Sequence, residues 1–319
     1  MNPDKLKDKF IGCTLVTHVG DSLGMPVEGY DCKTIEMKYG ELREMLDVRM
    51  GAGTYTDDTE MMIGIAESLV QCRGFNGRDM AGRFVKLYNP ERGYGGGTVR
   101  ALSLLREGID WNFAGERVFG GGSFGNGSSM RIAPIGAFYY DKPDDLRKIA
   151  CESSNITHAH PYCKEGAALQ AFAVAKAINS DPSEELDKQS FVSDMITFVS
   201  DEGKLYKAKL QHIKELLEYV PDKAEVIDRL GNDSSAPNSV PTAIYSFISH
   251  SHDFEGSVSY AVSLGGDTDT IGAMTGAISG AYHGKSGIPQ RWLNVLENGE
   301  RGRGYIEMLA EKLWELKSL

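Results

Sequence analysis

The chain has 319 residues, of which 41% are hydrophobic and 25% are charged, and its formal net charge is −11 at pH 7. This composition is typical of a globular protein with a sizeable core. The acidic balance argues against a nucleic-acid-binding protein, so we expect no direct nucleic-acid contact. The sequence contains no run of about 18 apolar residues, and no membrane span is expected.

Cysteine usage and the first residues of the chain bear on the cellular compartment. The five cysteines are scattered, odd in number and form no CxxC pair, which is typical of reduced thiols. Residues 1–9 are charged and lack the apolar stretch of a signal peptide. We therefore expect a cytoplasmic protein, and we also expect a monomer.

Helical patterns dominate the first half of the chain. Apolar residues recur at helical spacing over 4–19, and two glycines and a proline mark 20–28 as turn-rich. Residues 31–50 predict a short helix and a loop, and a second loop at 51–60 leads into an apolar helix. The helices predicted after residue 60 are 61–72, 77–89, which Pro90 stops, and 98–107.

The second half of the chain is also helical in pattern. Residues 183–220 predict two amphipathic helices, and the polar segment 221–240 predicts a loop. Few runs show the alternation of a strand, and neither a linker nor a repeat is evident. We therefore predict an all-α fold with a single domain over residues 1–319. The other predicted helices are 143–155, 162–179, 243–250 after Pro241, one that opens at 267–270, and 305–316.

An acidic cluster, Asp267-Thr-Asp-Thr270, follows a Gly-Gly turn and opens an apolar helix. Two aspartates at i and i+2, each beside a threonine, exceed what helix capping requires. The surplus of oxygen atoms indicates a hard-cation site. Glycines recur every four residues along the same helix, and this row predicts close packing against another backbone. The row consists of Gly272, Gly276, Gly280 and Gly284.

A second acidic cluster, Thr56-Asp57-Asp58-Thr59, enters another apolar helix about 210 residues earlier. Taken alone it suits an N-cap, with Asp57 capping and Glu60 completing a capping box. If the two helices are neighbours, however, four carboxylates converge with no Lys or Arg inside either cluster, and this charge needs cations. All-oxygen ligands favour two Mg²⁺ or Mn²⁺ ions over Zn²⁺.

The densest run of glycines lies at 120–131, Gly-Gly-Gly-Ser-Phe-Gly-Asn-Gly-Ser-Ser-Met-Arg. The run lacks the spacing of a P-loop and the strand context of a dinucleotide fold, and one alternative is a flexible connector. The other is a loop that exposes backbone N–H groups and cradles a phosphate or diphosphate.

Three further groups carry possible chemistry. In Asn155-Ile-Thr-His-Ala-His-Pro161, a metal site is disfavoured because no third soft ligand is near. One histidine can instead contact a ligand or the backbone, or serve only at a helix start. Asp21 and Glu28 are either solvated turn carboxylates or part of a movable loop over a site.

Together these segments resemble the ADP-ribosylglycohydrolase family. The resemblance covers residues 20 to 272 in the order of the family's motifs, and although each motif is weak, the ordered set is specific. The matching pieces are Gly20-Asp-Ser-Leu-Gly24 with Glu28, Tyr55-Thr-Asp-Asp-Thr59, Phe124-Gly-Asn-Gly-Ser-Ser-Met-Arg131, Thr157-His158 and Gly265-Gly-Asp-Thr-Asp-Thr-Ile-Gly272.

The resemblance implies a compact, orthogonal all-α fold around a dinuclear Mg²⁺ or Mn²⁺ centre. It implies a diphosphate cradle in the glycine-rich loop, with His158 at the ribose or a phosphate. The implied metal ligands are Thr56, Asp57, Asp58, Asp267, Asp269 and Thr270. The expected substrate contacts are Asp21, Gly122, Ser123, Phe124, Gly125, Asn126, Gly127, Ser128 and His158.

Three segments resemble the ADP-ribosylhydrolase 3 branch more than the arginine-specific branch. They are Arg92-Gly-Tyr-Gly95, Ser123-Phe-Gly-Asn-Gly127 and Ser239-Val-Pro-Thr-Ala-Ile-Tyr245. That branch cleaves O-linked ADP-ribose from serine, poly(ADP-ribose) and O-acetyl-ADP-ribose, and Glu28 falls where it has a glutamate on a mobile flap. Phe124 replaces a tyrosine common in that branch, and Ser128 and Ser129 replace small residues, which leaves the acceptor open.

The expected reaction is hydrolysis at the anomeric carbon of the distal ribose through an oxocarbenium-like transition state. The expected catalytic residues are Glu28, Asp58 and Asp269, and the sequence does not choose between Glu28 and Asp269 for proton transfer. Three alternatives are an ADP-ribosyl-arginine hydrolase, an ADP-ribose-binding module without turnover, and a phosphatase-type dinuclear hydrolase. The last normally brings histidine into the metal cluster, and here no histidine adjoins either acidic motif.

Overall fold

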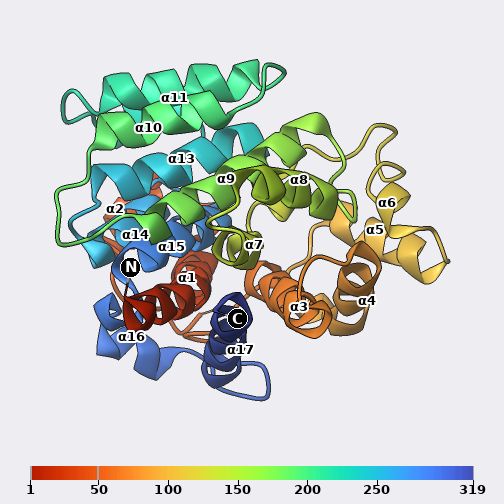
Figure 1. The fold of residues 1–319 in the computed structure, drawn as a ribbon. Helices are drawn as coiled ribbons and strands as arrows, with labels where there is room; N and C mark the ends of the chain where they lie inside the picture. Colours follow the sequence, from red (N-terminus) through yellow and green to blue (C-terminus); the bar gives the residue numbers. More distant parts are fainter. Residues whose placement is uncertain (1, 49, 319) are drawn as a thin grey trace.

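A computed structural model describes residues 2–48 and 50–318, and these residues fold into helices (Figure 1). Within these two ranges the only β pairings are two isolated bridges, Asp31 with Gly265 and Gly125 with Ser235. The all-α prediction is confirmed. The prediction of one domain over 1–319 stays a prediction, and Met1, Arg49 and Leu319 lie outside the described residues.

The helices follow one another along the chain, and the longest connections are 40–56 and 115–125. Those before residue 155 are α1 (Pro3–Gly24), η1 (Met25–Val27), α2 (Cys32–Tyr39), α3 (Asp57–Cys72), α4 (Gly77–Leu87), η2 (Pro90–Arg92), α5 (Gly96–Arg106), α6 (Trp111–Ala114), η3 (Asn126–Ser128), α7 (Ala133–Phe138) and α8 (Pro143–Ser154). Those after it are α9 (Pro161–Asn179), α10 (Lys188–Phe198), α11 (Lys204–Leu216), α12 (Lys223–Leu230), α13 (Ala236–Ser249), α14 (Phe254–Ser263), α15 (Thr268–His283), η4 (Lys285–Gly287), α16 (Gln290–Val295) and α17 (Arg303–Lys317).

Helices α1 and α15 form the centre of the core and run antiparallel. Added Cβ atoms would clash, because one on Gly20 would lie 2.0 Å from the carbonyl oxygen of Gly272, and one on Gly280 would lie 2.2 Å from that of Gly12. A Cβ on Gly276 would meet the carbonyl oxygen of Val16 at 2.2 Å. The glycine row on α15 therefore allows two backbones to touch, as its spacing predicts.

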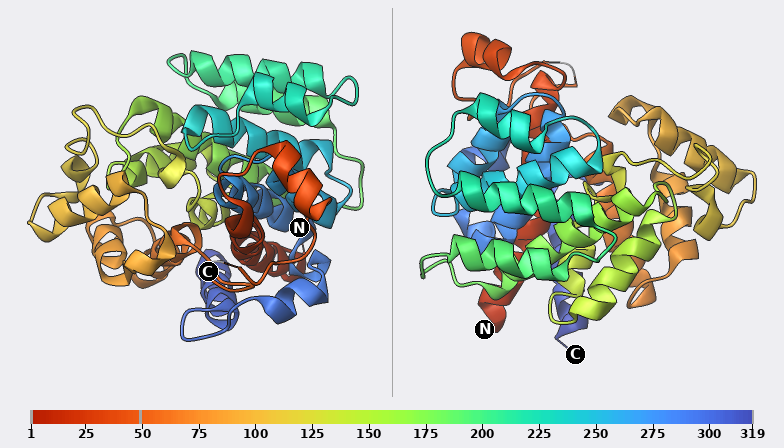
Figure 2. Two further views of the ribbon diagram at one scale, coloured as in Figure 1. Left: turned by 180° about the vertical axis from the view of Figure 1, so that it is seen from behind. Right: turned by 90° about the horizontal axis from the view of Figure 1, so that it is seen from above.

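The remaining helices surround this pair. Helices α9, α13 and α14 pack around α15, and α10 with α11 forms an outer layer at the top of Figure 1. Helices α3 to α6 build the right-hand side of Figure 1, and both termini lie on one face, as Figure 2 also shows. No helix in the described part of the chain is both long and apolar enough to cross a bilayer.

Two predicted connections are helical instead. The turn expected at 20–28 is the last part of α1, which continues to Gly24 before Pro26 enters η1. Gly20 and Gly24 are there for packing, since a Cβ on Gly24 would lie 2.2 Å from the carbonyl oxygen of Thr268. The glycines that signal a turn in sequence thus serve a helix contact.

The prediction of a loop over 221–240 is also wrong, because α12 lies within this range and α13 begins in it. Asp222 caps α12 by accepting a hydrogen bond from the Glu225 N–H at 2.8 Å. Helix α13 begins at Ala236 and contains Pro241, although proline removes one helical hydrogen bond. Pro241 and its neighbours are buried, so core packing outweighs the local cost.

Candidate active site

The two acidic clusters meet at the starts of α3 and α15. Asp57 and Asp58 open α3, and Asp267 is the N-cap residue of α15. The Thr270 hydroxyl donates to Asp58 Oδ1 at 3.4 Å and so links the two helix starts directly. The predicted convergence of the clusters is confirmed.

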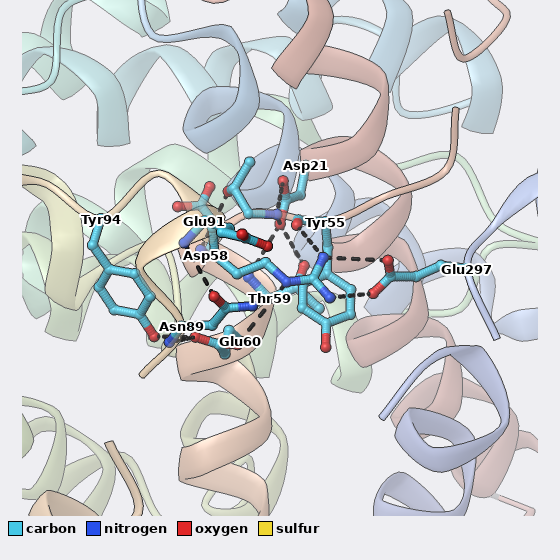
Figure 3. Close-up of polar contacts among 11 residues, drawn as sticks. Asp21, Tyr55, Asp58, Thr59, Glu60, Asn89, Glu91, Tyr94 and Glu297 are labelled. Carbon is cyan, nitrogen blue, oxygen red and sulfur yellow. Dashed lines mark hydrogen bonds and ion pairs between the residues drawn. The ribbon is translucent and has the colours of Figure 1, made fainter. Parts of the chain in front are cut away.

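The capping of α3 differs from the expected capping box. Thr56, not Asp57, is the N-cap residue, and its Oγ1 accepts from the Asp58 N–H at 3.4 Å. Glu60 turns away and accepts from the Tyr94 hydroxyl at 2.6 Å and from the Asn89 N–H at 3.1 Å (Figure 3). The Asp57 and Asp58 side chains are therefore not consumed by capping.

Asp21 supplies the missing acceptors from inside the core. This fully buried carboxylate on α1 accepts from the N–H groups of Thr56 at 3.0 Å and Thr59 at 3.1 Å, and from the Thr59 hydroxyl at 2.6 Å (Figure 3). Burial raises the pKa of Asp21 to about 6, and these hydrogen bonds oppose the shift. Asp21 is not the solvated turn carboxylate that the sequence allows, and it lies behind Thr56 and Thr59 rather than on the cavity wall.

The carboxylates concentrate negative charge in a cavity of about 400 Å³. One carboxylate oxygen from each of Glu28, Asp267 and Asp269 lies within 4.8 Å of the other two. Among the described residues that line the cavity none is Lys or Arg. Its lining includes Glu28, Thr56, Asp57, Asp58, Ser123, Gly125, Asn126, Gly127, His158, Asp267, Asp269 and Thr270.

Burial and mutual repulsion disfavour the charged forms of these carboxyl groups, and a bound cation would relieve that repulsion. Burial first, and then the charge of Asp21, raises the pKa values of Asp57 and Asp58 well above their usual range. The pKa of Asp269 is raised by burial and by the charges of Asp267 and Glu28. Asp58 Oδ2 is buried without a hydrogen-bond partner among the described residues. A set of oxygen donors with one buried atom unused fits a hard divalent ion.

The glycine-rich loop forms the opposite wall and is tied to the carboxylates. Asn126 Nδ2 donates to Asp267 Oδ2 at 2.5 Å and to the Ser239 hydroxyl at 3.1 Å. The loop backbone pairs with the segment before α13, where the Asn126 N–H donates to the Ser234 carbonyl at 2.9 Å. The loop is therefore held in place at the cavity, which the flexible-connector alternative does not explain.

A cysteine fixes the other side of this loop. The Cys163 thiol, in the first turn of α9, lies 3.0 Å from the Ser123 carbonyl oxygen and 2.6 Å from that of Gly125. Because N–H and C=O of a trans peptide point in opposite directions, these contacts turn the Phe124 N–H away from Cys163. Gly122 has a φ of +88°, and a Cβ there would lie 2.5 Å from the His160 nitrogen.

The predicted substrate contacts do not all line the central cavity. Gly122 and Phe124 line an adjoining hollow of about 800 Å³, together with Phe119 and Ser234. The Ser128 hydroxyl is fully buried and donates to the Cys163 carbonyl at 3.4 Å, away from the cavity. Ser128 therefore supports the loop from behind, as Asp21 supports α3.

The two histidines have separate places. His158 lines the cavity, and its Nδ1 lies 2.7 Å from the Thr157 hydroxyl. Burial and the nearby Arg131 lower the pKa of His158 to about 3, which keeps the ring neutral. His160 is the N-cap residue of α9, where its Nδ1 accepts from the Tyr162 N–H at 3.1 Å. The helix-start alternative thus applies to His160, and His158 faces the site.

Sequence reasoning missed several residues around the cavity. Arg92 stacks 3.8 Å over the Tyr55 ring, donates to the Tyr55 carbonyl at 2.7 Å and pairs with Glu297 at 2.9 Å (Figure 3). Arg92 therefore stabilises the segment that leads to Thr56. Phe119 is 65% exposed and lines both the central cavity and the adjoining hollow. Its position directly before the glycine run was the sequence signal that could have identified it.

The fold and the cavity together define an all-α protein with a carboxylate-rich site of the kind that holds divalent cations. Comparison with known proteins identifies the family. The ADP-ribosylglycohydrolase family model matches residues 2–319, and the chain belongs to this family.

Several relatives span nearly the whole chain. The ADP-ribosylhydrolase ARH3 of Gallus gallus is 36% identical over 97% of this chain and 93% of its own length, and that of Homo sapiens is 34% identical over 96% and 92%. A solved ADP-ribosylglycohydrolase-related protein complex has a TM-score of 0.78 and 29% identity over 98% of this chain and 99% of its own. The ADP-ribosylarginine hydrolase Tri1 of Pseudomonas putida is 24% identical over 99% of this chain and 80% of its own length.

Proposed function

We propose that this protein hydrolyses the glycosidic bond at the anomeric carbon of ADP-ribose and releases O-linked ADP-ribose from modified proteins. The observation that carries the proposal is the convergence of two acidic helix starts opposite a fixed glycine-rich loop. Carboxylates suit the ions, and the Phe124 N–H, which is turned away from Cys163, suits a diphosphate. Poly(ADP-ribose) and O-acetyl-ADP-ribose belong to the same proposal, because both carry a ribose bonded through oxygen.

The likeness to the ARH3 proteins supports an O-linked acceptor. Identity to these proteins reaches 36%, against 24% to the ADP-ribosylarginine hydrolase. An arginine-linked substrate is therefore the second candidate. A module that binds ADP-ribose without turnover fits less well, because all four aspartates of the two helix starts are present.

Six residues would hold two Mg²⁺ or Mn²⁺ ions. They are Thr56, Asp57 and Asp58 on one side, and Asp267, Asp269 and Thr270 on the other. When bound, the ions would activate a water molecule and orient the ribose hydroxyls. Asn126 keeps Asp267 in place, and Asp21 keeps the start of α3 in place, so both sides are organised before substrate enters.

Glu28 suits the exchange of protons with the leaving acceptor. Its carboxylate is exposed at the cavity mouth, whereas Asp58 and Asp269 are buried among the proposed metal ligands. A group at the mouth can reach both the departing oxygen and solvent, as general acid–base catalysis requires. Asp269 then serves mainly to hold an ion.

The nucleotide would lie along the glycine-rich loop. Ser123, Gly125, Asn126 and Gly127 line the central cavity and would contact the diphosphate and distal ribose, with neutral His158 beside them. Gly122 and Phe124 line the adjoining hollow, which suits the adenosine. We further propose that the protein acts in the cytoplasm as a monomer without binding nucleic acid.

One substrate panel tests the proposal. The protein is incubated with serine-linked, arginine-linked, polymeric and O-acetyl forms of ADP-ribose, with Mg²⁺ or with chelator, and released ADP-ribose is measured. We expect O-linked forms to be cleaved only with metal.

Two matched variants make this panel specific. The D57A/D58A variant should lose all hydrolysis, whereas D144A/D145A should keep it. Asp144 and Asp145 also form a pair in a first helical turn, but both are exposed on α8. Full activity of D57A/D58A in chelator would contradict the proposal, and preferred cleavage of the arginine-linked form would favour the second candidate.

A further inference from the structure

A third hollow adjoins the central cavity at Glu28. It has a volume of about 480 Å³, and we name it the Tyr39 groove. Glu28 is the only residue that lines both hollows in the described part of the chain. The groove is lined by Pro26, Glu28, Gly29, Tyr30, Tyr39 and Val48.

The hollow lined by Gly122 and Phe124, which we name the nucleotide hollow, adjoins a different part of the central cavity from the Tyr39 groove. The nucleotide hollow shares Phe119, Ser123, Gly125 and Ser234 with the cavity. Gly97, on the cavity wall at the start of α5, also belongs to that part, because a Cβ there would lie 3.1 Å from the Phe119 ring. An ADP-ribose that extends from this hollow to the carboxylates would end beside Glu28. Its bond to the acceptor would therefore point toward the groove.

The wall of the groove is fixed relative to the carboxylates. The Gly29 N–H donates to the Gly266 carbonyl at 2.8 Å, and the Gly266 N–H donates to the Tyr30 carbonyl at 2.8 Å. The residue after Gly266 is Asp267, a proposed metal ligand. A group seated against Tyr30 is therefore held in register with the reacting centre.

Pro26, two tyrosine rings and Val48 give the groove apolar surface beside its polar groups, and its walls are partly open to solvent. Tyr39 is 36% exposed and Val48 is 42% exposed. The Lys38 ammonium lies 4.3 Å from the Tyr30 ring centre and covers one side of that ring. Helix α2, which carries Tyr39, lies at the outer edge of the molecule in the view from above (Figure 2), where a large partner can approach.

We propose that the Tyr39 groove binds the polypeptide acceptor and takes up an apolar side chain next to the ADP-ribosylated residue. This inference rests on the proposed function. The proline, tyrosine and valine side chains of the groove lie beside the reacting centre and match such a side chain, whose burial is favourable. The preceding unit of an ADP-ribose polymer fits worse, because its diphosphate would meet the Glu28 carboxylate and because Gly266 occupies the Gly29 N–H.

The test compares two matched double variants. Y39S/V48S makes the groove polar, and Y219S/V220S makes the same changes at an exposed site, where Tyr219 is 49% and Val220 97% exposed. Each is assayed on a serine-ADP-ribosylated peptide with leucine beside the serine, on the same peptide with glycine there, on the polymer and on O-acetyl-ADP-ribose. The single pair V48S and V220S repeats the comparison if a double variant folds poorly.

We expect Y39S/V48S to lower kcat/KM about tenfold on the leucine peptide, with less than about a twofold change on O-acetyl-ADP-ribose. The wild type should also prefer the leucine peptide to the glycine peptide, and Y219S/V220S should behave as wild type. An unchanged leucine-peptide rate, an equal loss on every substrate, or a loss confined to the polymer would overturn the inference while leaving the proposed function in place. A wild-type protein that cleaves none of these substrates would overturn both.

Discussion

The two acidic helix starts look alike in sequence but are held in place by different neighbours. The start of α3 is organised from the core, because Asp21 on α1 takes up the N–H groups of Thr56 and Thr59. The start of α15 is organised mainly from the glycine-rich loop, because the buried side chain of Asn126 holds Asp267. One half of the proposed metal centre is therefore coupled to folding stability, and the other is coupled to the nucleotide loop.

Loss of Asp21 should have the largest effect, since it affects the core-supported half. In Asp21→Asn an amide NH2 replaces one acceptor oxygen and faces buried donors. We expect a loss of about 2 kcal/mol or more in unfolding free energy and roughly 100-fold weaker Mn²⁺ binding. Urea denaturation and Mn²⁺ titration measure the two effects.

Asp8 provides the control for Asp21. It also lies on α1 and accepts from the Ser286 hydroxyl at 2.7 Å, but at an exposed site. Asp8→Asn should change stability by less than about 1 kcal/mol. Wild-type Mn²⁺ affinity in Asp21→Asn would show that the α3 start needs no support from α1.

The glycine contact between α1 and α15 should come next. In Gly272→Ala the new Cβ would lie 2.6 Å from the Gly20 carbonyl oxygen, and forcing the helices apart should cost about 1–3 kcal/mol. Gly82, inside α4, has open space around it, so Gly82→Ala should instead stabilise by up to about 1 kcal/mol. Equal effects of the two substitutions in urea denaturation would refute the packing role.

Asn126→Ala tests whether the glycine-rich loop supports the start of α15. Asp267 would lose the donor that orients it, and metal affinity should fall about tenfold. Unfolding free energy should change less than in Asp21→Asn, because Asn126 belongs to a loop, whereas Asp21 belongs to the central helix α1. Asn179→Ala, which removes a donor to the Tyr140 carbonyl at the end of α9, should leave metal affinity unchanged. If Asn126→Ala bound metal as tightly as the wild type, Asp267 would not need the Asn126 hydrogen bond for its orientation.

Cys163→Ala should have the smallest effect. Without the thiol the loop carbonyls of Ser123 and Gly125 lose their contact, and KM should rise about threefold to fivefold with little change in kcat. Cys163→Ser keeps a donor at the same place and should restore KM. A fall in kcat that serine does not rescue would indicate a packing role only.

Local sequence was sufficient to predict much of this structure. The glycine period on α15 predicts a close backbone contact, and the paired aspartates predict a shared site, because both signals lie within one helical turn or one helix face. The partner surface on α1 was missed, since Gly20, Gly24 and Pro26 carry the same local signal as a turn. Only the long-range contact with Thr268 and Gly272 shows that this segment is helical rather than a turn.

Roles that depend on long-range contacts were not predictable in the same way. Asp21 accepts from residues 35 and 38 positions away, and Arg92 pairs with a glutamate 205 positions away. No periodicity encodes such partners. Pro241 in α13 shows the opposite case, where a strong local breaker is overruled by burial.

Both acidic helix starts are proposed to hold the same pair of ions. The most direct test is to count the Mn²⁺ bound per chain at equilibrium in the wild type, D57A/D58A, D267A/D269A and D144A/D145A. We expect two ions for the wild type and D144A/D145A, and a loss of tight binding when either helix start is changed. Two ions retained by D57A/D58A or by D267A/D269A would contradict this proposal.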